Sequence, residues 1–165
     1  MKSHFCLAKQ IATKHGVAID MPAGPSELLV VADDSANAAF VASDLLSQAE
    51  HGVDSQVILV STSKQMIAAV ETEVEQQLEK LPRKAIAEKA IANSKLIYVE
   101  EDQVAIELIN VYGPEHYIIC VKNEALYIDN IHNAGSVFIG NGAGRHETNS
   151  NRLYIENSDI SSPLN

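Results

Sequence analysis

The sequence predicts an α/β fold: a three-layer α/β/α arrangement with a mainly parallel sheet. Short apolar, β-branched runs alternate along the chain with stretches of helical periodicity. Parallel strands need crossover connections, and helices that cross over cover both faces of the sheet. Ligands of such sheets gather outside the carboxyl ends of the strands, so this is the edge where we expect a site.

Local signals place the elements along the chain. Asp34 or Ser35 is expected to cap a helix that Gly52 closes, Ser63 to cap the next one, and Pro82 to break it. The expected elements are a helix over 5–14, strands over 17–20 and 27–32, the helix ending at Gly52, a strand over 56–60, helices over 64–80 and 83–93, a strand over 96–99, a helix over 103–111, a strand over 117–121, a helix over 124–130 and a strand over 137–139.

We expect two regions: a domain over 1–140 and a divergent polar tail over 141–165. The tail is rich in Asn, Ser and Gly, and its one short apolar run is Leu153-Tyr154-Ile155. It lacks a complete amphipathic period, so the sequence predicts partial disorder there.

Composition excludes several classes of partner. The formal net charge of −10 argues against nucleic acid and against anionic membranes. No apolar run reaches the roughly 18 residues of a membrane span, and the first residues are too polar for a secretory signal. Cys6 and Cys120 form no CxxC motif, which favours buried free thiols in a reducing compartment. We therefore expect a cytoplasmic protein.

Three places carry residues that could bind a metal or act in catalysis. Gln48 and His51 leave one helix face a turn apart, which suits two metal ligands, although a histidine near a helix end is more often a complement to the helix dipole. Ser26 follows a rigid Pro-Ala-Gly-Pro run, which on composition alone is more often a simple turn. Glu115 and His116 follow a Gly-Pro turn and could act as general acid and base if a loop lets both face one cleft, but such pairs are usually just exposed polar residues.

Four blocks of sequence stand out: Ile19–Glu27 (Ile-Asp-Met-Pro-Ala-Gly-Pro-Ser-Glu), Ala42–Gly52 (Ala-Ser-Asp-Leu-Leu-Ser-Gln-Ala-Glu-His-Gly), Tyr112–His116 (Tyr-Gly-Pro-Glu-His) and Ala134–Gly140 (Ala-Gly-Ser-Val-Phe-Ile-Gly). Together, and in this order, they resemble the histidinol dehydrogenase family and extend the resemblance over roughly residues 8 to 140. The fold that it implies is an incomplete Rossmann-like domain. The resemblance implies oxidation of L-histidinol through an aldehyde to L-histidine, the last steps of histidine biosynthesis, with NAD and zinc as cofactors. This chain would be the second of the family's two Rossmann-like domains.

The resemblance also implies site residues. Gln48 and His51 match two zinc ligands that also hold the substrate, and Ser26 matches a substrate-contacting serine. His116 would take the hydroxyl proton and contact the substrate, and Glu115 would help activate the water that adds to the aldehyde. Zinc would orient histidinol by its imidazole and amine.

This chain departs from the family pattern. Family members are much longer, carry most NAD contacts in a domain preceding this one, and take a further zinc ligand from across a dimer. The segment 142–149 only echoes the family's Gly-rich block, and by counting, Asn149 falls where the family has its aspartate ligand. With two identifiable ligands, we expect the isolated chain to hold zinc weakly and to be inactive unless His146 supplies a replacement.

Three hypotheses follow. The chain is part of a histidinol dehydrogenase, either as a truncated gene product or as a fragment. Alternatively, it is a catalytically inactive remnant that acts as a binding or dimerisation module. The third is a self-sufficient small enzyme with an unrelated substrate.

Overall fold

The computed structural model describes residues 26–140 and 153–156 of the chain. Within these residues a six-stranded sheet has the order β3-β2-β1-β4-β5-β6, parallel except for β6, which runs antiparallel to β5. The predicted mainly parallel α/β fold is confirmed. The helix expected over 5–14, the strand expected over 17–20 and Cys6 lie outside the described residues.

The elements alternate as the sequence indicates. They are β1 (Glu27–Ala32), α2 (Ala38–Ala49), β2 (Gln56–Ser61), α3 (Lys64–Leu78), α4 (Lys84–Ala92), β3 (Lys95–Tyr98), α5 (Asp102–Tyr112), β4 (His116–Cys120), α6 (Glu124–Ile128), β5 (Ser136–Ile139) and β6 (Leu153–Glu156).

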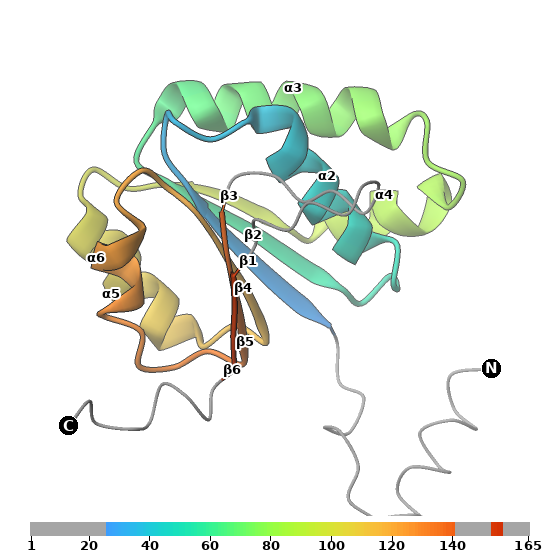
Figure 1. Ribbon diagram of the computed structural model, residues 1–165. Coiled ribbons are helices and arrows are strands. Elements are labelled where there is room, and N and C mark those ends of the chain that lie inside the picture. The colour runs from blue at the N-terminus through green and yellow to red at the C-terminus, as the bar shows by residue number, and fades with distance from the viewer. Residues whose placement is uncertain (1–25, 141–152, 157–165) are drawn as a thin grey trace, which may run out of the picture.

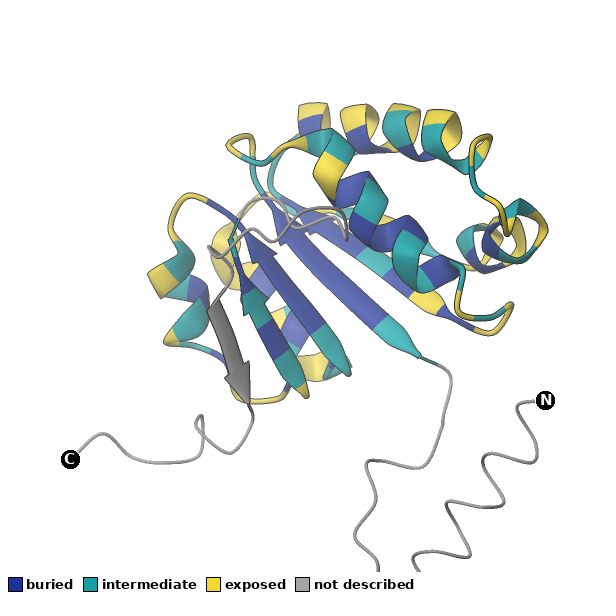
Figure 2. Ribbon diagram, turned by 45° about the vertical axis from the view of Figure 1, so that its right-hand side comes forward, coloured by how far each residue is buried: buried dark blue, intermediate teal, exposed yellow. Residues whose placement is uncertain are grey.

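The helices form two layers, one on each face of the sheet (Figure 1). Alternate residues of β1 supply the two cores: Leu28 and Val30 pack with α2 and α3, whereas Leu29 and Val31 pack with α5 and α6. The strands at the centre are buried on both faces, as Figure 2 shows. Such burial explains why β1 reads as a continuous apolar run rather than as an alternating one.

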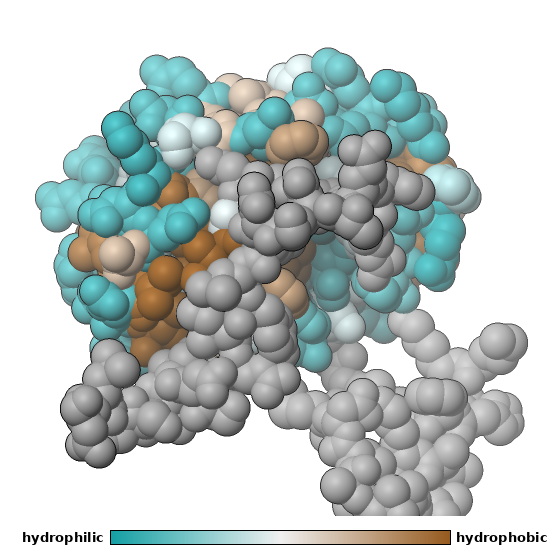
Figure 3. Space-filling view, viewed as in Figure 1, coloured by the Kyte–Doolittle hydropathy of each residue, from teal (hydrophilic) through white to brown (hydrophobic). Residues whose placement is uncertain are grey.

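The outer surface reflects the same layering. The outward side of α3 is hydrophilic, while apolar side chains come to the surface over α5 and α6 (Figure 3). Within the described part of the chain, no helix combines the length and apolar character needed to cross a membrane. Cys120 is buried, and its thiol donates a hydrogen bond to the Gly140 carbonyl at 3.4 Å.

The helix α2 begins later than the sequence predicts. Asp34 and Ser35 were the expected caps, but Asn37 caps the helix by accepting a hydrogen bond from the Ala39 N–H at 3.0 Å. Ser35 is instead engaged by Asp33, which takes its N–H and its hydroxyl. The expected Ser63 cap of α3 is confirmed by its bond to the Met66 N–H at 3.2 Å.

Two further differences concern the second half of the chain. The strand β4 begins at His116, one residue earlier than expected, so His116 lies in a strand and only Glu115 lies in the turn. The segment expected to be a partly disordered tail contains β6, whose Leu153 pairs with Ile139 of β5. A short apolar run became a strand because the neighbouring edge offered a partner.

Candidate functional site

The turn that presents Glu115 and His116 is fixed from both sides. Helix α5 ends at Gly113, which adopts the left-handed conformation (φ 62°) that glycine tolerates best. The segment before β5 holds the other side: Gly135 donates its N–H to the Pro114 carbonyl at 2.9 Å, and Ser136 donates to the Glu115 carbonyl at 2.8 Å. The packing at Gly135 is so close that a Cβ would collide with the Glu115 carbonyl oxygen.

His116 points toward the face covered by α2. It opens β4 two residues before Ile118, which belongs to the α2 and α3 core, and strand residues two apart share a face. Its Nδ1 lies 3.2 Å from the Glu27 carbonyl oxygen. A carbonyl only accepts, so Nδ1 carries the proton and Nε2 of the neutral ring keeps its lone pair. The geometry therefore makes Nε2 the basic atom.

Glu115 is also held by Glu27 of β1. Its Oε2 accepts a hydrogen bond from the Glu27 N–H at 3.4 Å. One residue of β1, Glu27, thus contacts both members of the predicted acid–base pair through its N–H and its C=O, across 88 and 89 positions of sequence. The sequence reasoning missed Glu27 because these contacts are made by its backbone, which no side-chain pattern reveals.

Gln48 and His51 lie at the end of α2 on the same side of the sheet. Helix α2 starts after the carboxyl end of β1 and runs back to Ala49, so these two residues reach the amino ends of the strands. The Nε2 of Gln48 is buried and has no hydrogen-bond partner within the described part of the chain. His51 is exposed in the turn that leads to β2. A buried amide without a partner is costly and indicates a missing interaction.

Ser26 completes the set at the same edge. It directly precedes β1, and its carbonyl oxygen accepts the Gln56 N–H at the start of β2 (3.1 Å). All five candidate residues thus lie at or near the amino ends of the strands, not at the carboxyl ends where the sheet type led us to expect a site. The reason is that Ser26 directly precedes β1, and Glu115 and His116 lie at the start of β4. Gln48 and His51 lie at the end of α2, which runs back to the same edge.

At the carboxyl edge, a hydrogen bond joins the loops after β1 and β4, where the strand order reverses. Asp33, directly after β1, accepts the Lys122 N–H after β4 at 2.8 Å and the Ser35 N–H at 2.9 Å. Burial opposes its ionisation, but these hydrogen bonds outweigh burial and lower the pKa of Asp33 below 3.8. A fixed carboxylate at this crevice disfavours a phosphate group there.

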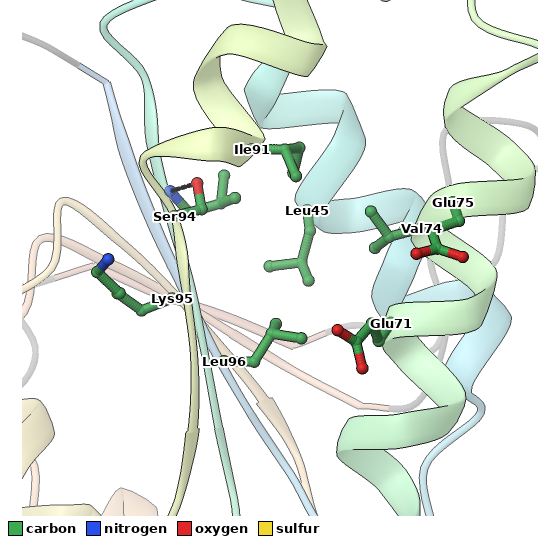
Figure 4. A pocket seen from close by; sticks show the side chains of 9 residues that line it. Leu45, Glu71, Val74, Glu75, Ile91, Ser94, Lys95 and Leu96 are labelled. Carbon is green, nitrogen blue, oxygen red and sulfur yellow. Dashed lines mark hydrogen bonds between the residues drawn. The ribbon is translucent and has the colours of Figure 1, made fainter.

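A pocket of about 250 Å³ lies elsewhere, between α3, α4 and the sheet edge at β3. In Figure 4, Leu45, Val74 and Leu96 project into an apolar space with Glu71 at its border. Its Ser94 hydroxyl is already used, donating to the Ala90 carbonyl and accepting the Val57 N–H. None of the five candidate residues lines this pocket, and its composition suits an apolar group rather than acid–base chemistry.

One aromatic contact escaped the sequence reasoning. The ring of Phe138 in β5 stacks on the imidazole of His116, with centroids 6.4 Å apart and an interplanar angle of 21°. The sequence showed Phe138 only as part of a buried strand. Its relation to His116 depends on the register between β4 and β5, which no local signal carries.

Comparison with known proteins gives a consistent result. The family model described as histidinol dehydrogenase matches residues 3–147. The chain is 53% identical over 154 residues to a histidinol dehydrogenase of Bacteroides thetaiotaomicron, covering 91% of this chain and 36% of that protein. It is 59% identical over 133 residues to one of Bacteroides fragilis, covering 81% and 31%.

A solved structure agrees. The crystal structure of histidinol dehydrogenase from Elizabethkingia anophelis superposes with a TM-score of 0.75 at 54% identity, covering 82% of this chain and 31% of that one. The chain therefore spans about a third of the length of the relatives it matches.

Proposed function

The chain belongs to the histidinol dehydrogenase family, and from this premise we propose that it supplies the acid–base half of a histidinol dehydrogenase active site. In this proposal L-histidinol is oxidised to L-histidine in two steps, with NAD and zinc as cofactors, in the cytoplasm and as a homodimer. The observation that carries the proposal is that the backbone of Glu27 contacts both Glu115 and His116.

His116 is the base in both oxidation steps. With Nδ1–H donated to the Glu27 carbonyl, Nε2 accepts the hydroxyl proton of the alcohol while the carbon-bound hydrogen leaves as hydride. NAD, when bound, accepts that hydride. After it has released the first proton to solvent, the same atom serves the second oxidation, in which the hydrated aldehyde loses a proton and a hydride to give the carboxylic acid, and the acid then ionises to the carboxylate.

Glu115 acts between the two oxidations. Its Oε2 is held by the Glu27 N–H, so we assign Oε1 to the water that adds to the aldehyde carbon. The carboxylate takes one proton from that water as its oxygen bonds to carbon. Ser26 contacts the substrate at the same edge. This division of work predicts different effects of substitution at Glu115 and His116.

The described residues do not complete a zinc site. Gln48 fits a ligand role, because its buried Nε2 lacks a partner there and a half-turn of the amide exchanges its nitrogen and oxygen. With His51 it provides two donors, fewer than the three protein ligands of a catalytic zinc. Among the residues that the structure describes, no three His, Cys, Asp or Glu side chains come together as a metal site. We therefore derive no step through the metal.

The incomplete donor set favours a second candidate, an inactive module that binds or dimerises. Dehydrogenase activity distinguishes the inactive module from the proposed enzyme. The measurement is NADH formation from NAD and L-histidinol by the longest native polypeptide that carries this sequence. His116→Asn should lower kcat by about 10²–10⁴-fold, the usual contribution of a general base. His132→Asn, at an exposed histidine whose N–H is bonded to Asn110, is the matched control and should keep full activity.

Glu115→Gln gives an independent reading. It should slow the conversion of histidinal more than the oxidation of histidinol, because only the former needs the added water. Equal activity of wild type and His116→Asn, or no activity of the wild type above background, would reject the proposed function and leave the inactive module.

A further inference from the structure

We propose that Phe138 is a positioning residue that holds the imidazole plane of His116. The inference rests on the proposed function, in which Nε2 of His116 takes the substrate proton. It concerns a residue that neither holds the substrate nor transfers a proton, and it acts only through His116.

The sheet register brings the two rings together. Strands β4 and β5 are parallel, and His116 lies opposite Ser136, so Phe138 is the diagonal neighbour on the same face. Aromatic side chains reach across this diagonal, and the observed stacking, with centroids 6.4 Å apart and planes inclined by 21°, is in the range of an offset aromatic pair.

The hydrogen bond to Glu27 alone does not fix the ring. It holds the imidazole at one corner, Nδ1, and leaves the ring free to tilt about that point. The face of Phe138 limits this tilt because it lies nearly parallel to the imidazole. Together the two contacts define both the protonated nitrogen and the ring plane. The direction of the Nε2 lone pair is thereby set before substrate arrives.

Phe138 also packs against the core between the sheet and α2. Core packing accounts for an apolar residue at this position, but a branched aliphatic side chain would satisfy it equally well. The nearly parallel arrangement with the imidazole is the additional feature. A test must therefore separate the loss of the aromatic face from the loss of core volume.

Three variants make this separation. Phe138→Leu keeps an apolar side chain and removes the aromatic face, whereas Phe138→Tyr keeps the face. Ile139→Val, one residue along β5, removes a methylene from the opposite core, where Ile139 packs with α5 and α6, and serves as the control for weakening the strand. Melting temperature is recorded for each variant.

The first readout is the ¹⁵N NMR spectrum of the His116 ring in the intact chain. Wild type, Phe138→Tyr and Ile139→Val should show the Nδ1–H tautomer. In Phe138→Leu the ring is free to tilt, which misaligns its Nδ1–H with the Glu27 carbonyl, so an averaged pattern of both tautomers is expected. The second readout is dehydrogenase activity, where Phe138→Leu should lower kcat by about tenfold to a hundredfold with little change in KM. The other two variants should stay within about twofold of wild type.

An unchanged tautomer pattern in Phe138→Leu overturns the inference, and so does a changed pattern with wild-type kcat. The inference is also overturned if Ile139→Val loses as much kcat as Phe138→Leu and has the same melting temperature. The loss would then come from a weakened strand and not from the missing aromatic face. If the wild type shows no histidinol-dependent activity, the proposed function fails, and the NMR result alone decides whether Phe138 orients the ring.

Discussion

The two edges of the sheet use their polar groups in opposite ways. At the carboxyl edge, Asp33 after β1 accepts the Lys122 N–H after β4, and it also accepts the N–H and hydroxyl of the nearby Ser35. At the amino edge, the N–H and C=O of one residue of β1, Glu27, contact Glu115 and His116 while leaving Oε1 and Nε2 for other partners. The comparison shows that one sheet can bind a carboxylate within its own loops at one edge and leave carboxylate and imidazole atoms for other partners at the other edge.

The largest effect is expected at Gly135, on the amino edge. Gly135→Ala places a Cβ against the Glu115 carbonyl oxygen, and backbone cannot move aside cheaply. The variant should lose about 3 kcal/mol of unfolding free energy, as overpacked sites do, and should lose activity because the Glu115 turn is displaced. Urea denaturation and the NADH assay measure the two effects.

Gly113→Ala is its matched control in the same turn. Its Cβ meets the side-chain amide of Asn133, which can rotate away, so the cost reduces to that of a left-handed conformation, about 1–2 kcal/mol. If Gly113→Ala proves the more damaging of the two, the close contact between Gly135 and Glu115 is not what holds the turn.

At the carboxyl edge the expected effect is on stability alone. Asp33→Asn keeps one acceptor but removes the charge from its hydrogen bonds, which should cost about 1 kcal/mol of unfolding free energy at neutral pH. Activity should be unchanged, since Asp33 lies at the opposite end of the strands from His116. A loss of kcat in a folded Asp33→Asn variant would break the separation between the two edges.

The same substitution changes the pH dependence. The pKa of Asp33 is lower in the folded chain than its ordinary 3.8. The stability it contributes is therefore present above pH 3.8 and is lost as the pH falls from there through the folded pKa. Stability of the wild type should fall more steeply on acidification than that of Asp33→Asn, measured by denaturation at several pH values.

An effect of similar size is expected at Tyr127, also toward the carboxyl edge. Burial, and then the hydrogen bond from its hydroxyl to Asp102 at 2.7 Å, raise the pKa of Tyr127 above 10.0. Its contribution is complete below pH 10.0 and is lost as the pH rises further. Tyr127→Phe should cost about 1 kcal/mol at neutral pH and should reduce the alkaline loss of stability. If the stability of Tyr127→Phe falls as steeply at alkaline pH as that of the wild type, the group responsible for the fall is not Tyr127.

Sequence reasoning succeeded where local signals decided the structure. The short run Leu-Leu-Val-Val predicts a strand buried on both faces, as β1 is, and Ser63 caps α3 as its position predicts. It failed where the structure was determined by contacts that no local sequence signal carries. Ser35 was a plausible cap for α2, but Asp33 engages it, and Asn37 takes over. Likewise β6 exists because β5 offers an edge to pair with.

The candidate site shows the same limit. The resemblance to a known family supplied Ser26, Gln48, His51, Glu115 and His116, whereas the general rule for parallel sheets points to the opposite edge from the one where these residues lie. Glu27 and Phe138 were not found at all, because one acts through its backbone and the other through strand register. Both require the three-dimensional pairing of β1, β4 and β5, which composition and periodicity do not contain.

The most direct test of the amino-edge site is a titration of the ¹⁵N-labelled chain with L-histidinol, followed by amide NMR shifts. The account predicts that shifts concentrate in 26–27, 48–52 and 113–117, while 33–37 and 121–123 stay unchanged. Shifts that concentrate at 33–37 and 121–123 instead would place the ligand at the carboxyl edge and contradict the assignment of the site.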